Sequence, residues 1–173
     1  MQIVNTIATI TLDKPLDLSQ LHQNIEGSVQ GKSHWLKYRL QPENQYVAFY
    51  KSGKFLLTGK TVMNDLDGLV ERVHNLITDA GIITEIKEVN VSNIVAQSYF
   101  PLEKGLEAIL QRLCDEEEGT CEYEPEQFPG LNYKNWGVSF LLFSSGKFII
   151  TGAKTREQLE TAEKNFIELL GRI

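Results

Sequence analysis

Several features that would mark a particular kind of protein are scarce or absent in this chain. Only two cysteines, Cys114 and Cys121, occur in 173 residues, and no histidine lies near them to complete a zinc site. No apolar run approaches the roughly 20 residues of a membrane span. Residues 1–5 lack the basic and apolar regions of a signal peptide. These absences favour an intracellular protein whose two cysteines are reduced thiols.

Positive charge is also in short supply. The chain has 17 Lys and Arg against 23 Asp and Glu, which gives a net charge of −6. Because contacts with phosphates usually require a basic excess, composition alone argues mildly against a nucleic-acid-binding protein. No nucleophile–base pair, carboxylate dyad or metal-binding cluster is visible, so we expect no catalytic residue, metal or cofactor. The chain is not expected to be an enzyme.

An internal repeat is the most informative pattern that is present. SGKFLLTGK at residues 52–60 recurs as SGKFIITGAK at residues 145–154, and VNTIAT at residues 4–9 recurs more loosely as SNIVAQ at residues 92–97. The matches follow the same order in both halves, which predicts a duplicated module of about 85–90 residues. We expect a first repeat over residues 1–85 and a second over 86–173, forming a single intertwined body.

Each half has the periodicity of strands followed by helices. Alternating apolar and β-branched residues predict the strands, and apolar residues at helical spacing predict the helices. Together they predict an α+β fold, in which helices cover one face of an antiparallel sheet and the almost uncharged other face is a binding surface. The strands are expected over residues 2–12, 34–41, 45–51, 54–59, 82–88, 89–99, 131–135, 138–144 and 147–152, and the helices from residue 16 and over 62–80, 102–114 and 155–170.

Motifs in the second half resemble a known protein family. EYEPEQFPG at residues 122–130, LLFSSGK at 141–147 and ITGAK at 150–154, with the paired Asn5 and Asn93, resemble the TATA-box-binding protein family in its archaeal form. The resemblance covers nearly the whole chain and is most specific in the second repeat. It implies a saddle-shaped, curved antiparallel sheet with helices on the convex face. A protein of this family is a general transcription initiation factor that binds and bends A·T-rich promoter DNA through the minor groove.

The resemblance also implies roles for individual residues. Asn5 and Asn93 would lie at the centre of the DNA site, where A·T pairs offer only acceptors in the minor groove. Phe128 and Phe143 would be wedges that open a base step at one end of the site. The other implied DNA contacts are Thr58 and Thr151 beside the asparagines, the apolar or aromatic Ile7, Tyr50, Leu56, Val95 and Ile149, and the basic Arg39, Lys54, Lys60, Lys134, Lys147 and Lys154.

Partners follow from the same resemblance. Glu124, Glu126 and Gln127 match the loop on which transcription factor B docks, which would recruit RNA polymerase indirectly. Dimerisation through the apolar face is a further hypothesis for the DNA-free protein, and the expected location is the cytoplasm with the nucleoid, or the nucleus in a eukaryote. The negative net charge fits DNA binding if the acidic residues lie away from the DNA face. Those expected on or beside helices are Asp65, Asp67, Glu71, residues 115–118, Glu157, Glu160 and Glu163.

The first repeat departs from the family pattern. Where the second repeat reads EPEQFPG, the first reads GSVQGKS at residues 27–33, so a wedge phenylalanine is missing. Tyr50 occupies the position of Phe143, and Trp35 or His34 are candidates to replace the lost wedge. Two alternatives therefore stay open. One is a divergent paralogue that regulates transcription through protein contacts with weak or no DNA bending, and the other is a small-molecule-binding module.

Overall fold

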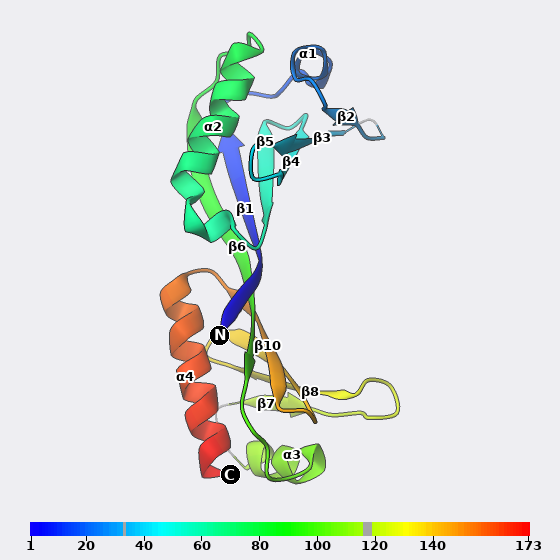
Figure 1. Cartoon of the computed structure of the whole chain (residues 1–173), viewed down its shortest axis with the longest axis vertical. Helices are drawn as coiled ribbons and strands as arrows, with labels where there is room; N and C mark the ends of the chain where they lie inside the picture. Colours follow the sequence, from blue (N-terminus) through cyan, green and yellow to red (C-terminus); the bar gives the residue numbers. More distant parts are fainter. Residues whose placement is uncertain (33, 116–118) are drawn as a thin grey trace. The chain divides into compact units, whose positions relative to one another are not determined.

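A computed structural model describes residues 1–32, 34–115 and 119–173 of the chain. The chain divides into two compact units, one of residues 5–92 and the other of residues 1–4 with 93–173. Both have helices and antiparallel strands in the same order along the sequence (Figure 1). We call them the first and second unit.

The first unit has the strand order β2-β3-β4-β5-β1, and neighbouring strands in this order are antiparallel. Strand β1 begins just before the unit boundary. Its elements are β1 (Gln2–Leu12), α1 (Leu18–Asn24), β2 (Val29–Gln30), β3 (Trp35–Leu40), β4 (Gln45–Tyr50), β5 (Lys54–Gly59), a short 3-10 helix (Val62–Asn64) and α2 (Leu66–Asp79).

The second unit repeats this arrangement with the strand order β6-β10-β9-β8-β7. The elements that follow α2 are β6 (Ile86–Tyr99), α3 (Leu106–Cys114), β7 (Thr120–Glu122), β8 (Gly130–Asn135), β9 (Val138–Phe143), β10 (Lys147–Ala153) and α4 (Arg156–Arg172).

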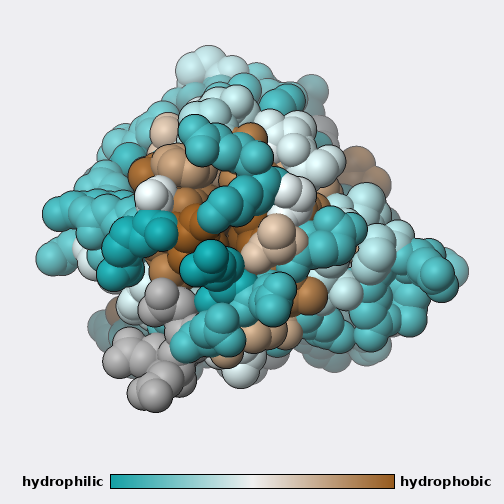
Figure 2. Space-filling model, turned by 90° about the horizontal axis from the view of Figure 1, so that it is seen from below, coloured by the Kyte–Doolittle hydropathy of each residue, from teal (hydrophilic) through white to brown (hydrophobic). Residues whose placement is uncertain are grey.

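One face of the strands in each unit packs against helices. In the first unit, Ala8 and Ile10 of β1 form a buried cluster with Val73 and Ile77 of α2. In the second unit, Phe166 of α4 stacks on the buried Phe140 of β9, with ring centroids 4.1 Å apart. Figure 2 shows a group of apolar side chains surrounded by hydrophilic ones on the surface seen from below. The α+β fold with an antiparallel sheet, predicted from periodicity, is confirmed.

The repeated SGK motif has a backbone function in both units. Gly53 and Gly146 each adopt a left-handed conformation, with φ of 86° and 83°. A Cβ atom on either glycine would lie 2.2 Å from a backbone carbonyl oxygen, that of Lys14 or Phe100. The glycine oxygens accept hydrogen bonds from the N–H groups of Leu12 and Phe100 at 2.8 and 2.9 Å. Glycine is therefore required at both turns for its conformation and for its size.

Several element boundaries differ from those predicted. The prediction of a separate strand over residues 82–88 was wrong, because β6 is one continuous strand that starts at Ile86. The helix over 62–80 is divided by Asp65, whose side chain accepts from the N–H of Gly68 and caps α2. Helix α3 starts at Leu106 rather than at residue 102.

The short edge strands β2 and β7 were not predicted. They have two and three residues, too few for an alternating pattern to be recognised. No helix within the described residues is long and apolar enough to cross a membrane.

Candidate nucleic-acid interface

The sheet surface of the first unit that faces away from the helices is partly exposed and nearly free of acidic residues. Along β1, Asn5, Ile7 and Thr9 are half-buried and alternate with fully buried neighbours. Directly paired residues lie on the same side of a sheet, so the strand register identifies the rest of this surface. This open face of the first unit also comprises Leu56 and Thr58 of β5, Tyr46 and Tyr50 of β4, and Trp35, Lys37 and Arg39 of β3.

The second unit has a matching surface. Asn93 and Val95 of β6 are half-buried, as their counterparts in β1 are. The open face of the second unit continues with Gln97 and Tyr99 of β6, Lys147, Ile149 and Thr151 of β10, Ser139, Leu141 and Phe143 of β9, Asn132 and Lys134 of β8, and Glu122 of β7.

An asparagine–threonine pair recurs on both open faces. The Thr58 hydroxyl donates to Asn5 Oδ1 over 3.1 Å in the first unit. In the second unit Asn93 Oδ1 accepts from the Thr151 hydroxyl at 3.3 Å and from the backbone N–H of Gly152 at 2.8 Å. A backbone N–H can only donate, so this bond fixes the orientation of the Asn93 amide. The NH₂ group of Asn93, which can donate two hydrogen bonds, therefore points away from Thr151 and Gly152.

A β-bulge in β10 supplies the additional N–H. Ile150 pairs with Ala96 and Ala153 pairs with Ile94, so one extra residue is accommodated in β10. Gly152 lies within this bulge at φ 98°, a conformation suited to glycine. The bulge explains why the second copy reads TGAK where the first reads TGK. The inserted residue therefore leaves the asparagine–threonine pair intact.

The expected wedge residues of the second unit form an aromatic pair. The rings of Phe128 and Phe143 meet edge to face with centroids 6.1 Å apart, and Phe128 is 46% exposed. The N–H groups of Gln127 and Phe128 both donate to the carbonyl of Glu124 at 2.9 Å, which forms a tight turn before β8. Phe128 thus projects from a locally constrained loop rather than from the core.

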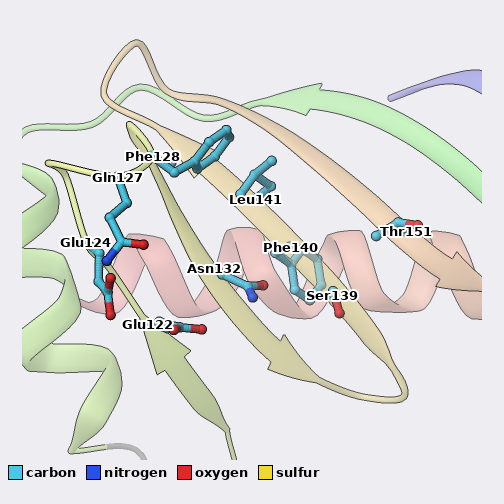
Figure 3. A pocket seen from close by; sticks show the side chains of 10 residues that line it. Glu122, Glu124, Gln127, Phe128, Asn132, Ser139, Phe140, Leu141 and Thr151 are labelled. Atoms are coloured by element: carbon cyan, nitrogen blue, oxygen red, sulfur yellow. The ribbon is translucent and has the colours of Figure 1, made fainter.

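A groove of about 410 Å³ lies beside this aromatic pair on the open face of the second unit. Its floor is formed by residues of β8, β9 and β10, and its rim includes the loop before β8 (Figure 3). Phe128 and Leu141 lie at one end of it, whereas Glu122, Glu124 and Gln127 lie at another side. The groove therefore has both an apolar and an acidic boundary.

The first unit has a different aromatic pair at the equivalent position. Tyr50 pairs with Trp35 in the same way as Phe143 pairs with Gly130. The Trp35 ring fills the space above Gly31, where a Cβ atom would lie 2.3 Å from it, and Lys37 Nζ is 4.4 Å from the ring centroid. The register thus puts Trp35, the candidate replacement that lies opposite Tyr50, at the position of Gly130, two residues after that of Phe128. Ser33, the last residue of the divergent segment, lies outside the described residues.

The prediction of an almost uncharged open face is wrong, since both open faces carry basic side chains, with one acidic exception among the described residues. Exposed basic side chains lie on both open faces: Lys37 and Arg39 on the first, and Lys134 and Lys147 on the second. Three more lysines are exposed at or just beyond the ends of strands, namely Lys54, Lys60 and Lys154. The exception is Glu122, which pairs with Asn132 on the second open face. Four of the acidic residues expected on helices are exposed there: Asp67 and Glu71 on α2, and Glu157 and Glu160 on α4. Asp65 caps α2, and Glu163 of α4 accepts a hydrogen bond from the Ser98 hydroxyl. Residues 116–118 lie outside the described part of the chain.

Strand register brings further residues to the open faces that motif reading did not assign. Their shared feature is that strand pairing places them on the same side of the sheet as the assigned residues, and pairing between distant strands cannot be established from one sequence. They are Thr9, Lys37, Tyr46, Gln97, Tyr99, Glu122, Asn132, Ser139 and Leu141.

The fold and the two open faces define a duplicated α+β protein with a repeated, exposed sheet surface. The family described as "Transcription factor TFIID (or TATA-binding protein, TBP)" matches residues 1–80 and 88–173. The chain belongs to this TATA-binding protein family. The resemblance and the fold class inferred from its motifs are thereby confirmed.

Individual relatives cover nearly the whole chain. The TATA-box-binding protein of Aeropyrum pernix is 35% identical over 95% of this chain and 81% of its own length. That of Methanopyrus kandleri is 36% identical over 97% of this chain and 94% of its own. Among solved structures, "Methanococcus jannaschii TBP" is similar with a TM-score of 0.78 and 27% identity, covering 99% of this chain and 98% of that one.

Proposed function

We propose that this chain is a general transcription initiation factor that binds A·T-rich promoter DNA in the minor groove and bends it. The observation that carries the proposal is the asparagine–threonine pair repeated on two sheet faces whose charged side chains, apart from Glu122, are basic. In the minor groove, A·T pairs present only the acceptors N3 and O2, whereas G·C pairs add the N2 amino donor. An amide held by its oxygen, as Asn93 is, offers its two donors to such acceptors and is mismatched to guanine.

The apolar side chains around this pair suit the same groove. Ile7 and Leu56 of the first open face, with Val95 and Ile149 of the second, are half-buried and so available for contact with sugars and base edges. Basic side chains, among them Arg39, Lys54, Lys60, Lys134, Lys147 and Lys154, would contact phosphates. Each neutralised phosphate lowers the logarithm of the binding constant by about 0.9 per tenfold rise in salt.

DNA bending would come from aromatic residues that unstack base steps. Phe128 and Phe143 supply such a pair in the second repeat. We assign Trp35 with Tyr50 to the corresponding role in the first repeat, because the strand register places them opposite each other. The two repeats, which we assign to residues 1–85 and 86–173, would then wedge DNA with different aromatic side chains.

A protein partner completes the proposed role. Glu124, Glu126 and Gln127 are exposed in the loop before β8, where they would dock transcription factor B and so recruit RNA polymerase. The protein would act where promoter DNA is, with the nucleoid in the cytoplasm or in the nucleus of a eukaryote. This role involves binding and DNA distortion and requires no covalent chemistry.

End-to-end fluorescence energy transfer on a short TATA-containing duplex tests the proposal. We expect a bend with steep salt dependence that disappears when the A·T core is replaced by G·C. The same duplex with transcription factor B present tests the partner, and Glu124→Arg is expected to block recruitment while sparing DNA binding. Absence of a bend under all these conditions would contradict the proposal and support a regulator that acts through protein contacts.

A further inference from the structure

The two cysteines form a pair that takes no part in the proposed DNA interface. Cys114 is the last residue of α3 and Cys121 is the middle residue of β7, and α3 packs against β7. Their sulfur atoms lie 2.7 Å apart. Both thiols are free; Cys114 is exposed, whereas Cys121 is half-buried. Two packed elements, rather than a chance loop position, therefore bring the sulfur atoms together.

We propose that Cys114 and Cys121 are a redox modification site that closes to an intramolecular disulfide. A disulfide bond is about 2.0 Å long, so the present separation of 2.7 Å requires only a small side-chain adjustment. A metal site is the competing use of paired thiols. Within the described residues, however, no group of three or more His, Cys, Asp or Glu side chains could hold a metal ion. The pair thus has the geometry for a disulfide, and among the described residues no further ligands of a zinc site surround it.

The chemistry that closes the pair is thiol–disulfide exchange with a low-molecular-weight disulfide, RSSR. The thiolate of exposed Cys114 attacks one sulfur of RSSR, forms a mixed disulfide and releases RS⁻. The thiolate of Cys121 then attacks the Cys114 sulfur, closes the protein disulfide and releases the second RS⁻. Two protein thiols lose two electrons and two protons in total, and RSSR is reduced to two RSH.

Exposure and burial determine the order of these two steps. Burial, with the contact to Cys114, raises the pKa of the Cys121 thiol to about 12. A thiol is nucleophilic as its thiolate, so Cys121 is the poorer initial nucleophile. Its position against Cys114 makes it the resolving thiol, since the mixed disulfide forms next to it.

The cross-link would act on an edge of the sheet. Strand β7 is only three residues long and stands last in the strand order, with β8 as its single neighbour. Short edge elements open locally at low cost in free energy. A disulfide to α3 would hold β7 against that opening and would restrain Glu122, the next residue, at the rim of the groove.

Mass spectrometry and thermal unfolding of the full chain test the proposal. Reduced protein is incubated with glutathione disulfide and analysed without reductant. We expect a monomer lighter by about 2 Da, the mass of two hydrogens, with no remaining reactive thiol. We also expect a midpoint of thermal unfolding raised by about 5 °C relative to the reduced protein, because the closed loop restricts the unfolded chain.

Two variants make the result specific. Cys121→Ser is expected to stop at one glutathione adduct on Cys114, and Cys114→Ser to form no intramolecular cross-link and show no rise in midpoint. The thermal midpoint of each reduced variant checks that it folds. A stable glutathione adduct on wild-type Cys114 beside an alkylatable Cys121, or cross-linking only between chains, would overturn the proposal. Neither result bears on DNA binding, which is measured separately.

Discussion

The Asn93 amide offers the sharpest test of minor-groove recognition, because one substitution can remove its donors while keeping its acceptor. In Asn93→Asp the side chain keeps its shape and an oxygen for the hydrogen bonds from Thr151 and Gly152. The NH₂ group, the part proposed to meet the DNA, is replaced by a charged oxygen. The fold is therefore expected to survive while base contact is lost.

The size of the effect follows from these contacts. A good base-edge contact is worth about 1–3 kcal/mol, so loss of the donors weakens binding to TATA-containing DNA by roughly 5–150-fold. Repulsion between the new carboxylate and the base acceptors adds to this loss. Both acceptor interactions of residue 93 are retained, so the thermal midpoint is expected to change by no more than about 2 °C.

Asn75→Asp is the matched control, since Asn75 is exposed on α2 and undergoes the same chemical change. Its effect on DNA affinity is expected to be small and to vanish at high salt, because the charge lies on a helix away from the open face. Fluorescence anisotropy titrations with labelled duplex, over a salt series, measure both variants. Equal losses in the two variants, or wild-type affinity of Asn93→Asp, would refute the assignment of the Asn93 amide to base contact.

Three further predictions concern the wedge, the groove rim and the repeated turn. Phe128→Ala should reduce the bend measured by energy transfer while leaving the thermal midpoint nearly unchanged, because the side chain is 46% exposed; an unchanged bend would contradict its role as a wedge. Glu122→Gln should strengthen DNA binding about twofold at low salt, because it removes a charge that repels phosphates at about 10 Å. The control Glu160→Gln on α4 should have little effect. If Glu122→Gln binds DNA no more tightly than this control does, the place of Glu122 at the interface is contradicted. Gly146→Ala should lower the free energy of unfolding by about 1–3 kcal/mol, since its Cβ would lie 2.2 Å from the carbonyl oxygen of Phe100; a normal urea midpoint, compared with that of Gly171→Ala, would contradict the backbone argument.

Local chemistry in the sequence determined much of the fold. The SGK repeat revealed the duplication because each copy needs glycine at the same left-handed turn. Periodicity located the long helices and most strands, since burial of one face imposes it. Boundaries were less accurate where a capping side chain such as Asp65 divided a helix, or where β7 was too short to show alternation.

The composition of the open faces was decided only by tertiary structure. Motifs indicated Asn5, Asn93 and the threonines, and the structure joined each asparagine to its threonine by a hydrogen bond. Only strand register could place Trp35 opposite Tyr50 and bring Glu122 onto the same surface as Asn132. A strand's periodicity shows which of its residues share a side, but not which residue of another strand lies opposite. That pairing is fixed by hydrogen bonds between segments distant in the sequence, and it determines which side chains can meet DNA together.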